Sequence, residues 1–333
     1  MTRCITINRM LVHLTRLLLL LQGLIILGIA LAAHYVREMN WTMSLLLGTL
    51  AVLLVRMGIT ANNFFINRYY RGPPDEDTRL SWLQWLRVYL NEFMATMHCS
   101  SWAMPFLAFA GRPIPHPVGL PVLLIHGYAC NSGYWHRMSK ALAAAHITHY
   151  AIDLEPLFAG IDDYAPLIRE AVNRLCMESG KDRVIIVAHS MGGLVARAYL
   201  RKEGDTRIAK VITLGSPHKG SGLANFGLGA NSQQMRWTGS AREGQASAWL
   251  CQLQASENEQ GMARFVSIYS LHDNIIAPQS SSILPGAKNI AFRGIGHVAL
   301  AYTPEIHECV IREILATPAE TAPPQSHMAS RLS

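Results

Sequence analysis

Two scarcities in this chain of 333 residues each argue against a class of protein. Its six cysteines include no CxxC pair and follow no regular spacing, so they are expected to be free thiols and not the framework of a small secreted domain. Acidic residues are nearly missing from residues 1–71, which contain seven arginines and one acid, Glu38. The rest of the chain holds 22 basic and 21 acidic side chains. The net charge of +7 therefore belongs to the N-terminal end and does not indicate nucleic-acid binding.

Charged residues are also missing from two apolar runs near the N-terminus, residues 17–33 and 41–55. The first run nearly reaches the roughly 20 residues that cross a bilayer as a helix. The second covers about 22 Å at 1.5 Å per residue, which suffices only if Arg56 extends its charge to the interface and the helix continues toward Phe65. These runs predict a membrane anchor over residues 1–71.

The anchor is expected to be a hairpin of two transmembrane helices, about residues 14–36 and 41–62. Arginines precede the first helix and follow the second, and Arg37, beside Glu38, is the only one between them. By the positive-inside rule, both ends of the hairpin and the domain that follows lie in the cytoplasm. The alternative is a cleaved signal peptide with Ala30-Leu31-Ala32 as its small-x-small cleavage site, which would export the domain.

The most informative segment is VIIVAHSMGGLVARAYL (184–200), in which a β-branched run is followed by a helical pattern. The pattern small-x-Ser-x-Gly at the junction predicts a nucleophile elbow around Ser190, with Ala188 where glycine is commoner. Such a turn strains the serine backbone and lifts Oγ above the sheet. Small residues are expected at Ala188 and Gly192 because larger ones would collide across the turn, and Gly193 lets the helix pack closely. The helix N-terminus would direct unpaired N–H groups at an anion beside the serine.

A serine nucleophile needs a base to take its proton and an acid to orient that base. The runs FVSIYSLHDNIIAP (265–278) and NIAFRGIGHVALAY (289–302) place Asp273 and His297 at the ends of expected strands, on the same sheet edge as the serine. We expect His297 to be the base and Asp273 the acid. The rival acid is Asp153, which ends the run HYAID but precedes the serine in the chain.

An oxyanion hole requires two further backbone N–H donors. The residue after the nucleophile, Met191, supplies the first. The run LPVLLIHGYACNSGYW (120–135) predicts a buried strand followed by a loop, from which the N–H of Tyr128 is the best second donor. His126 is expected to shape this loop and not to transfer protons.

The segments HGYACNSGYW, VIIVAHSMGGLVARAYL, VITLGSPHKGS and LPGAKNIAFRGIGHVALAY, in this order, resemble the bacterial lipases and esterases of the α/β-hydrolase superfamily over about residues 121–316. The resemblance implies an α/β-hydrolase fold, a mostly parallel sheet with helices on both faces, in a domain spanning residues 118–316. It also implies the roles given above for the serine, acid, base and two donors. For an anchored, multi-pass protein of this kind, it implies a location in a bacterial inner membrane.

Within this superfamily the motifs most resemble those of the small lidless triacylglycerol lipases, from which the chain departs in a segment of about 45 residues. This segment, within residues 217–262, predicts a lid whose Trp237 and Trp249 face an acyl pocket, and the alternative is a disordered surface insertion. No acidic cluster matches the calcium site of the larger lipases, so we expect no metal. Asp162-Asp163 is expected to cap the helix that follows it.

Residues 72–117 are predicted to form an amphipathic helical linker between the anchor and the domain. Large apolar side chains recur at helical spacing from Trp82 to Met97. We expect this stripe to pack in a core, and a helix lying on the membrane interface is the alternative. Residues 317–333 are expected to be a disordered tail.

Together these features predict a membrane-anchored serine hydrolase that cleaves carboxylic esters of lipids through an acyl-enzyme. Its partner is then a lipid or small acyl-ester substrate, and neither a cofactor nor nucleic acid is expected. Because the triad does not select the acyl acceptor, an acyltransferase or thioesterase is one alternative. A non-catalytic membrane scaffold with a hydrolase-like domain is the other, and the complete triad argues against it.

Overall fold

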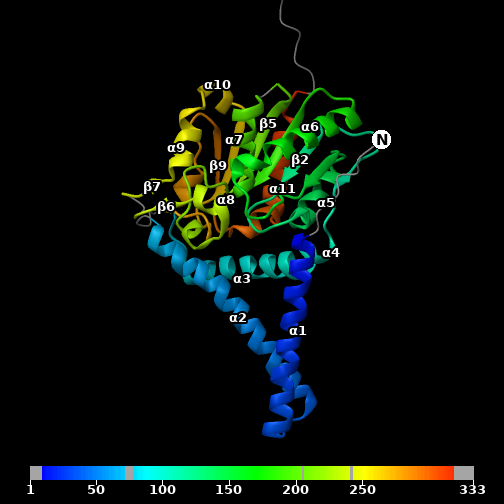
Figure 1. Ribbon diagram of the computed structural model, residues 1–333, viewed down its shortest axis with the longest axis vertical. Helices are drawn as coiled ribbons and strands as arrows, with labels where there is room; N and C mark the ends of the chain where they lie inside the picture. The colour runs from blue at the N-terminus through cyan, green and yellow to red at the C-terminus, as the bar shows by residue number, and fades with distance from the viewer. Residues whose placement is uncertain (1–9, 72–77, 205, 241–242, 319–333) are drawn as a thin grey trace, which may run out of the picture.

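The centre of the computed structural model is a seven-stranded sheet with the strand order β1-β3-β2-β4-β5-β8-β9 (Figure 1). The structure describes residues 10–71, 78–204, 206–240 and 243–318. Strand β1 is antiparallel to β3, and the other neighbouring strands of this sheet are parallel. The strands are β1 (Gly111–Arg112), β2 (Val122–Ile125), β3 (His149–Ile152), β4 (Val184–His189), β5 (Ile208–Leu214), β8 (Phe265–Ser270) and β9 (Lys288–Phe292).

Helices cover both faces of this sheet. Because successive residues of a strand point to opposite sides, each strand contributes side chains to both of the cores under these helices. Along β2, Val122 and Leu124 belong to one apolar core, and Leu123 and Ile125 belong to the other. The expected mostly parallel sheet with helices on both faces is therefore confirmed. The first core includes α5 (His136–Ala144) and α11 (Pro304–Leu315), and the second includes α6 (Ala165–Ser179) and α7 (Met191–Glu203).

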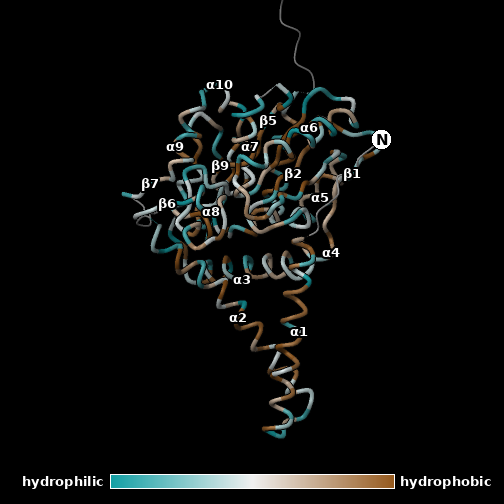
Figure 2. Tube along the Cα trace, viewed as in Figure 1, coloured by the Kyte–Doolittle hydropathy of each residue, from teal (hydrophilic) through white to brown (hydrophobic). Residues whose placement is uncertain are grey.

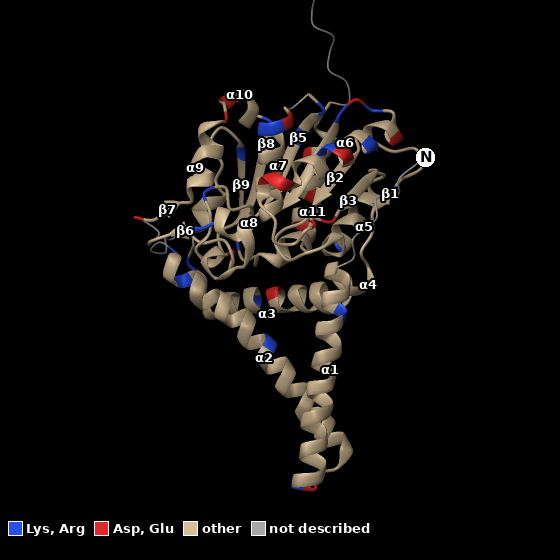
Figure 3. Cartoon of the chain, in the orientation of Figure 1, with Lys and Arg blue, Asp and Glu red and all other residues tan. Residues whose placement is uncertain are grey.

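The two N-terminal apolar runs form the long helices α1 (Met10–Arg37) and α2 (Trp41–Tyr70), which extend from the sheet domain as a stem (Figures 1 and 2). Both are long and apolar enough to cross a membrane, with mean hydropathies of 2.3 and 1.9. Few charged side chains lie along the stem (Figure 3). The helices approach closely at Gly48, where an added Cβ would lie 2.5 Å from the carbonyl oxygen of Ile26. Small residues at such contacts are typical of helix pairs packed in lipid.

Helix α3 (Trp82–His98) lies between the stem and the sheet domain (Figure 1). Ala95, on its inner side, belongs to the same core as α5 and α11. The expected packing of its apolar stripe in a core is wrong for much of the stripe, because Trp82 and Met94 are 72% and 63% exposed. An apolar face turned outward, next to two helices suited to lipid, supports the alternative of a helix on the membrane interface. Two short segments continue α3, the π-helical turn Cys99–Ala103 and α4 (Met104–Phe106).

The segment predicted to be a lid is attached to the domain at several points. Trp249 donates from Nε1 to Asp162 at 2.6 Å, and Glu257 forms a bidentate ion pair with buried Arg197 of α7, both N···O distances being 2.7 Å. The expectation that Trp249 faces the acyl pocket is wrong, because its ring also packs on Arg201 near the far end of α7. The elements of this segment are the 3-10 helix η5 (Gly222–Phe226), α8 (Gly229–Gln234), β6 (Trp237–Thr238), β7 (Gln245–Ala246), α9 (Ala248–Ala255) and α10 (Glu259–Met262).

The two adjacent aspartates before α6 differ in what they bind. Asp163 accepts the N–H of Gly160 at 2.9 Å, so it caps the turn that precedes the helix. Asp162 instead accepts from Arg201 and from Trp249, which corrects the expectation that both residues act as caps. Its carboxylate therefore connects α7 with the predicted lid.

Parts of several predicted segments lie outside the described residues. These are residues 1–9 of the predicted anchor, 72–77 at the start of the predicted linker, 205 and 241–242 within the predicted hydrolase domain and its lid, and 319–333 of the predicted tail. Thr317 is buried and donates to the carbonyl oxygen of Glu313 at 2.9 Å, so the beginning of the predicted tail packs against the end of α11.

Candidate active site

Ser190 lies on the sharp turn between β4 and α7. Its backbone has φ 53° and ψ −124°, a conformation that is rare and strained for a residue with a side chain. The N–H of Ser190 donates to the carbonyl oxygen of Leu214 at 2.9 Å, which fixes the turn against the end of β5. Since α7 begins at Met191, the N–H of Met191 belongs to the first helical turn, where donors lack an intrahelical partner.

The two glycines after Ser190 are required by close backbone contacts. An added Cβ at Gly192 would lie 2.5 Å from the carbonyl oxygen of Ile125, at the end of β2. At Gly193 it would lie 2.1 Å from Ser216 Oγ. The physical reason for Gly192 is therefore the neighbouring strand, which differs from the expected collision across the turn.

Asp273 and His297 are hydrogen-bonded at the same edge of the sheet. Asp273 Oδ2 lies 2.8 Å from His297 Nδ1, and both side chains are buried. The other carboxylate oxygen, Oδ1, accepts the N–H groups of Ile275 at 2.8 Å and Ile276 at 2.7 Å. The carboxylate is thus held in an orientation that directs one oxygen at the imidazole.

The surroundings of His297 favour its charged form. Burial opposes a charge on this imidazole, but the Asp273 carboxylate and its hydrogen bond, together with the charge of Glu92, raise the pKa of His297 above its ordinary value. Burial and the charge of His297 hold the pKa of neighbouring His189 well below its ordinary value. His189 therefore stays neutral, and its ring centroid lies 4.5 Å from that of His297.

The structure brings Ser190, Asp273 and His297 to one place. Leu214, which binds the N–H of Ser190, is followed by Gly215, where an added Cβ would lie 3.1 Å from Asp273 Oδ2 and 3.3 Å from His297 Nδ1. Within the described residues, Ser190 Oγ makes no hydrogen bond to His297. Bonds between a nucleophile and its base are often long before substrate binds and shorten in the complex with substrate.

The loop after β2 passes directly beside Ser190. An added Cβ at Gly127 would lie 2.8 Å from the Cβ of Ser190, so this loop can approach only with glycine at that position. Tyr128, the predicted second oxyanion donor, follows immediately. Its side-chain hydroxyl accepts the N–H of Leu228 and donates to the carbonyl oxygen of the same residue, both at 2.9 Å.

The rival acid, Asp153, has a different role. It accepts the N–H of Ser132 at 2.6 Å and lies 3.8 Å from Nε2 of His126. His126 in turn accepts the N–H of Leu154 at 3.0 Å, so this histidine holds two loops together. The histidine next to Asp273 in the chain, His272, is bonded to backbone atoms of Thr78 and Gly294.

One buried acid beside His297 was missed in the sequence. Glu92 of α3 accepts the N–H groups of Val298 and Ala299, each at 2.9 Å, with one carboxylate oxygen on each. It therefore holds the helical turn that begins just after His297. Its approach requires Gly296, where an added Cβ would lie 2.4 Å from Oε2 of Glu92. Glu92 is the only charged residue from 88 to 97, which was the available signal.

The described residues offer no cluster of side chains suited to binding a metal ion. Among the residues that the structure describes, no group of three or more His, Cys, Asp or Glu side chains could hold a metal ion.

Parts of this chain are similar in sequence to known proteins. A family model described as the alpha/beta hydrolase fold matches residues 121–258. A triacylglycerol lipase of Pseudarthrobacter phenanthrenivorans and one of Burkholderia plantarii are each 28% identical over 114 residues, or 32% of this chain. The chain covers only 35% and 32% of the lengths of these two relatives. A GPI inositol-deacylase of Candida albicans is 24% identical over 58% of this chain and 47% of its own.

A solved structure supports the fold. The mature form of the Bacillus licheniformis lipase BlEst2 superposes with a TM-score of 0.52 and 18% sequence identity, covering 62% of this chain and 97% of the lipase. With the family match and the strand order, this shows that the chain contains a domain of the α/β-hydrolase fold.

Proposed function

We propose that this protein is a membrane-anchored serine hydrolase that cleaves carboxylic esters of lipids. The observation that carries the proposal is the strained turn at Ser190, at the N-terminus of α7, on the sheet edge that also holds the bonded Asp273–His297 pair. Similarity to triacylglycerol lipases supports an ester as the substrate. Acyl transfer and thioester hydrolysis use the same residues, and a thioesterase, PPT2 of Rattus norvegicus, is 30% identical over 36% of this chain.

In this mechanism Ser190 Oγ attacks the acyl carbonyl carbon while His297 Nε2 takes the hydroxyl proton. The oxyanion is held by the N–H groups of Met191 and Tyr128. His297 then returns the proton to the departing alkoxide, and the C–O bond to the alcohol breaks. Water, deprotonated by His297, attacks the acyl-enzyme, and the proton passes to Ser190 as the acid leaves. Asp273 orients the imidazole and stabilises its charged form.

Glu92 is proposed to be a positioning residue for His297. Burial raises the pKa of Glu92, and the N–H groups of Val298 and Ala299 oppose this shift. The hydrogen bonds accepted by both oxygens stabilise the carboxylate form against this effect of burial. Its charge then adds to that of Asp273 in stabilising protonated His297.

This role predicts a shift in the pH profile of Glu92→Gln. The base works when neutral, so activity is present above the pKa of His297 and is lost as pH falls through it. Because Glu92 raises that pKa, its loss should move the acidic midpoint of kcat/KM to lower pH. Glu178→Gln, at an exposed carboxylate of α6, is the control and should leave the midpoint in place. An unchanged midpoint in Glu92→Gln would restrict Glu92 to a structural role.

Residues 217–262 are proposed to form a lid, with its apolar contact surface at Phe226 and Leu228. These side chains are 67% and 69% exposed, and Leu228 is bonded to the hydroxyl of Tyr128 in the predicted oxyanion loop. Exposed apolar groups next to a catalytic loop are suited to contact with a lipid surface.

A chain-length series of p-nitrophenyl esters tests the lid and the substrate class together. Phe226→Ser with Leu228→Ser should lower activity on emulsified long-chain esters by about tenfold, since about 1.4 kcal/mol of interfacial contact is a factor of ten. Activity on the soluble butyrate ester should stay within twofold. Met177→Ser, at an exposed apolar residue of α6, is the matched control. Equal losses on both esters in the lid variant would mean that this segment supports the core and is not a lid.

The anchor is proposed to remain attached, with the hydrolase domain on the cytoplasmic side. Leu11 of α1 belongs to the main core, and Nε of Arg16 donates to the carbonyl oxygen of Pro105 at 2.9 Å. A cleaved leader would remove both contacts. Because arginines flank the hairpin on the side of the domain, alkaline phosphatase fused after Arg71 should be inactive, and a green fluorescent protein fused there should be bright. An active phosphatase, or a mature N-terminus at Ala33, would show that the domain is exported.

A further inference from the structure

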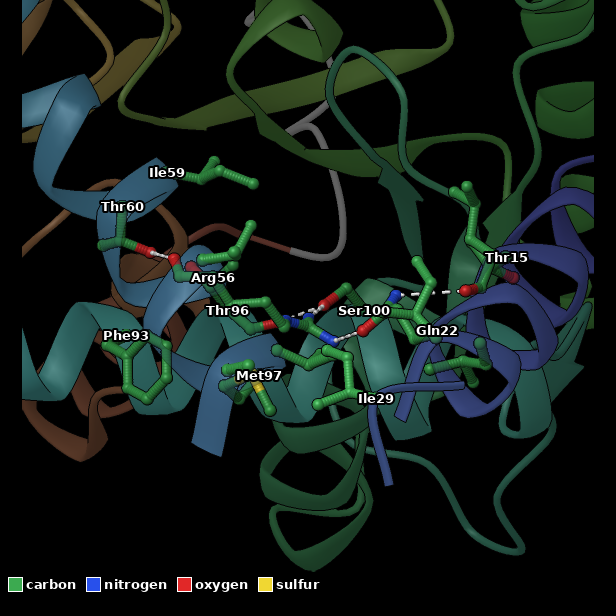
Figure 4. A pocket seen from close by; sticks show the side chains of 16 residues that line it. Thr15, Gln22, Ile29, Arg56, Ile59, Thr60, Phe93, Thr96, Met97 and Ser100 are labelled. Atoms are coloured by element: carbon green, nitrogen blue, oxygen red, sulfur yellow. Dashed lines mark hydrogen bonds between the residues drawn. The ribbon is translucent and has the colours of Figure 1, made fainter. Parts of the chain in front are cut away.

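A cleft lies where the stem meets α3, between α1, α2 and α3 (Figure 4). Its volume is about 430 Å³, within the range of small-molecule sites in proteins. Most of its wall is apolar, and each of the three helices contributes. Representative apolar lining residues are Leu19 and Ile25 of α1, Val52 and Val55 of α2, and Phe93 and Met97 of α3.

Among the described residues that line this cleft, Arg56 is the only charged one, and its guanidinium points toward Gln22 and Ser100. Nη1 donates to Gln22 Oε1 at 3.0 Å and to Ser101 Oγ at 2.8 Å, and Nη2 donates to Ser100 Oγ. These three acceptors are neutral. In the described part of the chain, Arg56 forms no ion pair with a carboxylate.

Two donors of Arg56 remain for a ligand. A guanidinium has five N–H groups, and three of them have acceptors among the described residues. The other two are Nε–H and one N–H of Nη2. Guanidinium N–H donors match the oxygens of a phosphate or carboxylate.

The position of Arg56 in the stem makes an uncompensated charge costly. A charged side chain within a membrane helix usually faces a partner or a polar cavity, and neutral hydrogen bonds do not cancel its charge. Ser100 and Ser101 follow α3, whose outer face is apolar and exposed as in an interfacial helix. Arg56 is thus placed near the level of lipid headgroups, with the apolar wall extending along the stem.

We propose that this cleft binds one anionic phospholipid, with its phosphate on Arg56 and an acyl chain along the apolar wall. The charge of Arg56 selects an anion, and phospholipid phosphates are the abundant anions at a membrane surface. The bound lipid would connect α1 and α2 with α3, which also carries Glu92. This inference rests on the proposed membrane insertion and does not require ester hydrolysis.

Native mass spectrometry of the full chain in detergent, with added phosphatidylglycerol, tests this proposal. The wild-type protein should retain one phosphatidylglycerol, and Arg56→Gln should reduce the retained fraction at least tenfold. Arg37→Gln removes the same charge at the tip of the stem and should bind as the wild type does. Val52→Trp keeps Arg56 but fills the apolar wall, so it should also lose the lipid. Unchanged thermal unfolding midpoints would show that the variants are folded.

Measuring lipid retention separately from ester hydrolysis distinguishes binding at this cleft from catalysis by the hydrolase domain. Ser190→Ala should retain phosphatidylglycerol as the wild type does, whatever its activity. Retention by folded Arg56→Gln at the wild-type level would overturn the proposal, as would a wild-type protein that retains no phospholipid. Retention of added palmitate in place of phosphatidylglycerol would also overturn it, because the site would then be one for a carboxylate.

Discussion

Ser190→Ala is expected to lower turnover of p-nitrophenyl butyrate by about 10⁴-fold or more, since loss of a triad member typically has an effect of this size. Only the nucleophilic oxygen is removed, so the fold should be unchanged. The measurement is kcat of the full-length protein in detergent, with the thermal unfolding midpoint as a check on folding.

The matched control for this prediction is Ser216→Ala. Ser216 is also buried and lies near the start of α7, but its Oγ has no hydrogen-bond partner among the described residues. Its variant should keep turnover within a few-fold of the wild type. Activity of Ser190→Ala within tenfold of the wild type would remove Ser190 from the mechanism.

Asp273→Asn is expected to lower kcat by about 10³- to 10⁴-fold. The asparagine oxygen can still accept the N–H groups of Ile275 and Ile276, but its NH₂ group would face Nδ1 of His297. The imidazole would then be held in the tautomer that cannot take a proton from the serine at Nε2.

Asp153→Asn separates the two candidate acids. Asparagine at position 153 can still accept the N–H of Ser132, so kcat should stay within about tenfold of the wild type. A large loss in Asp153→Asn together with normal activity in Asp273→Asn would assign the acid to Asp153.

Local sequence patterns were sufficient to predict the sheet architecture and the place of the serine. The elbow depends on a strand, a small residue, glycines and a helix within 17 consecutive residues, so its main determinants are local in the sequence. Asp273 and His297 could be located because each follows a strand, and parallel strands end at the same edge. The reason for Gly192 could not be predicted, since the carbonyl group that it approaches belongs to another strand.

Features that depend on contacts distant in sequence were not predicted. Glu92 lies 206 residues before its partner Val298, and nothing near it in the sequence indicates that pairing. The apolar stripe from Trp82 was expected in a core because periodicity shows that a helix has an apolar face but not what covers it. For a helix beside two helices that are long and apolar enough to cross a membrane, lipid could take the place of a protein core. Trp249 was misplaced for a similar reason, since its partner Asp162 lies 87 residues away.

The most direct test of the central claim is labelling of the full-length protein with a fluorophosphonate probe, followed by peptide mapping. An activated serine beside a neutral base reacts with such a probe, whereas an ordinary buried serine does not. We expect one labelled peptide, carrying the modification on Ser190, and labelling that decreases as pH falls through the raised pKa of His297. A folded protein that stays unlabelled, or that carries the label on another serine, would contradict it.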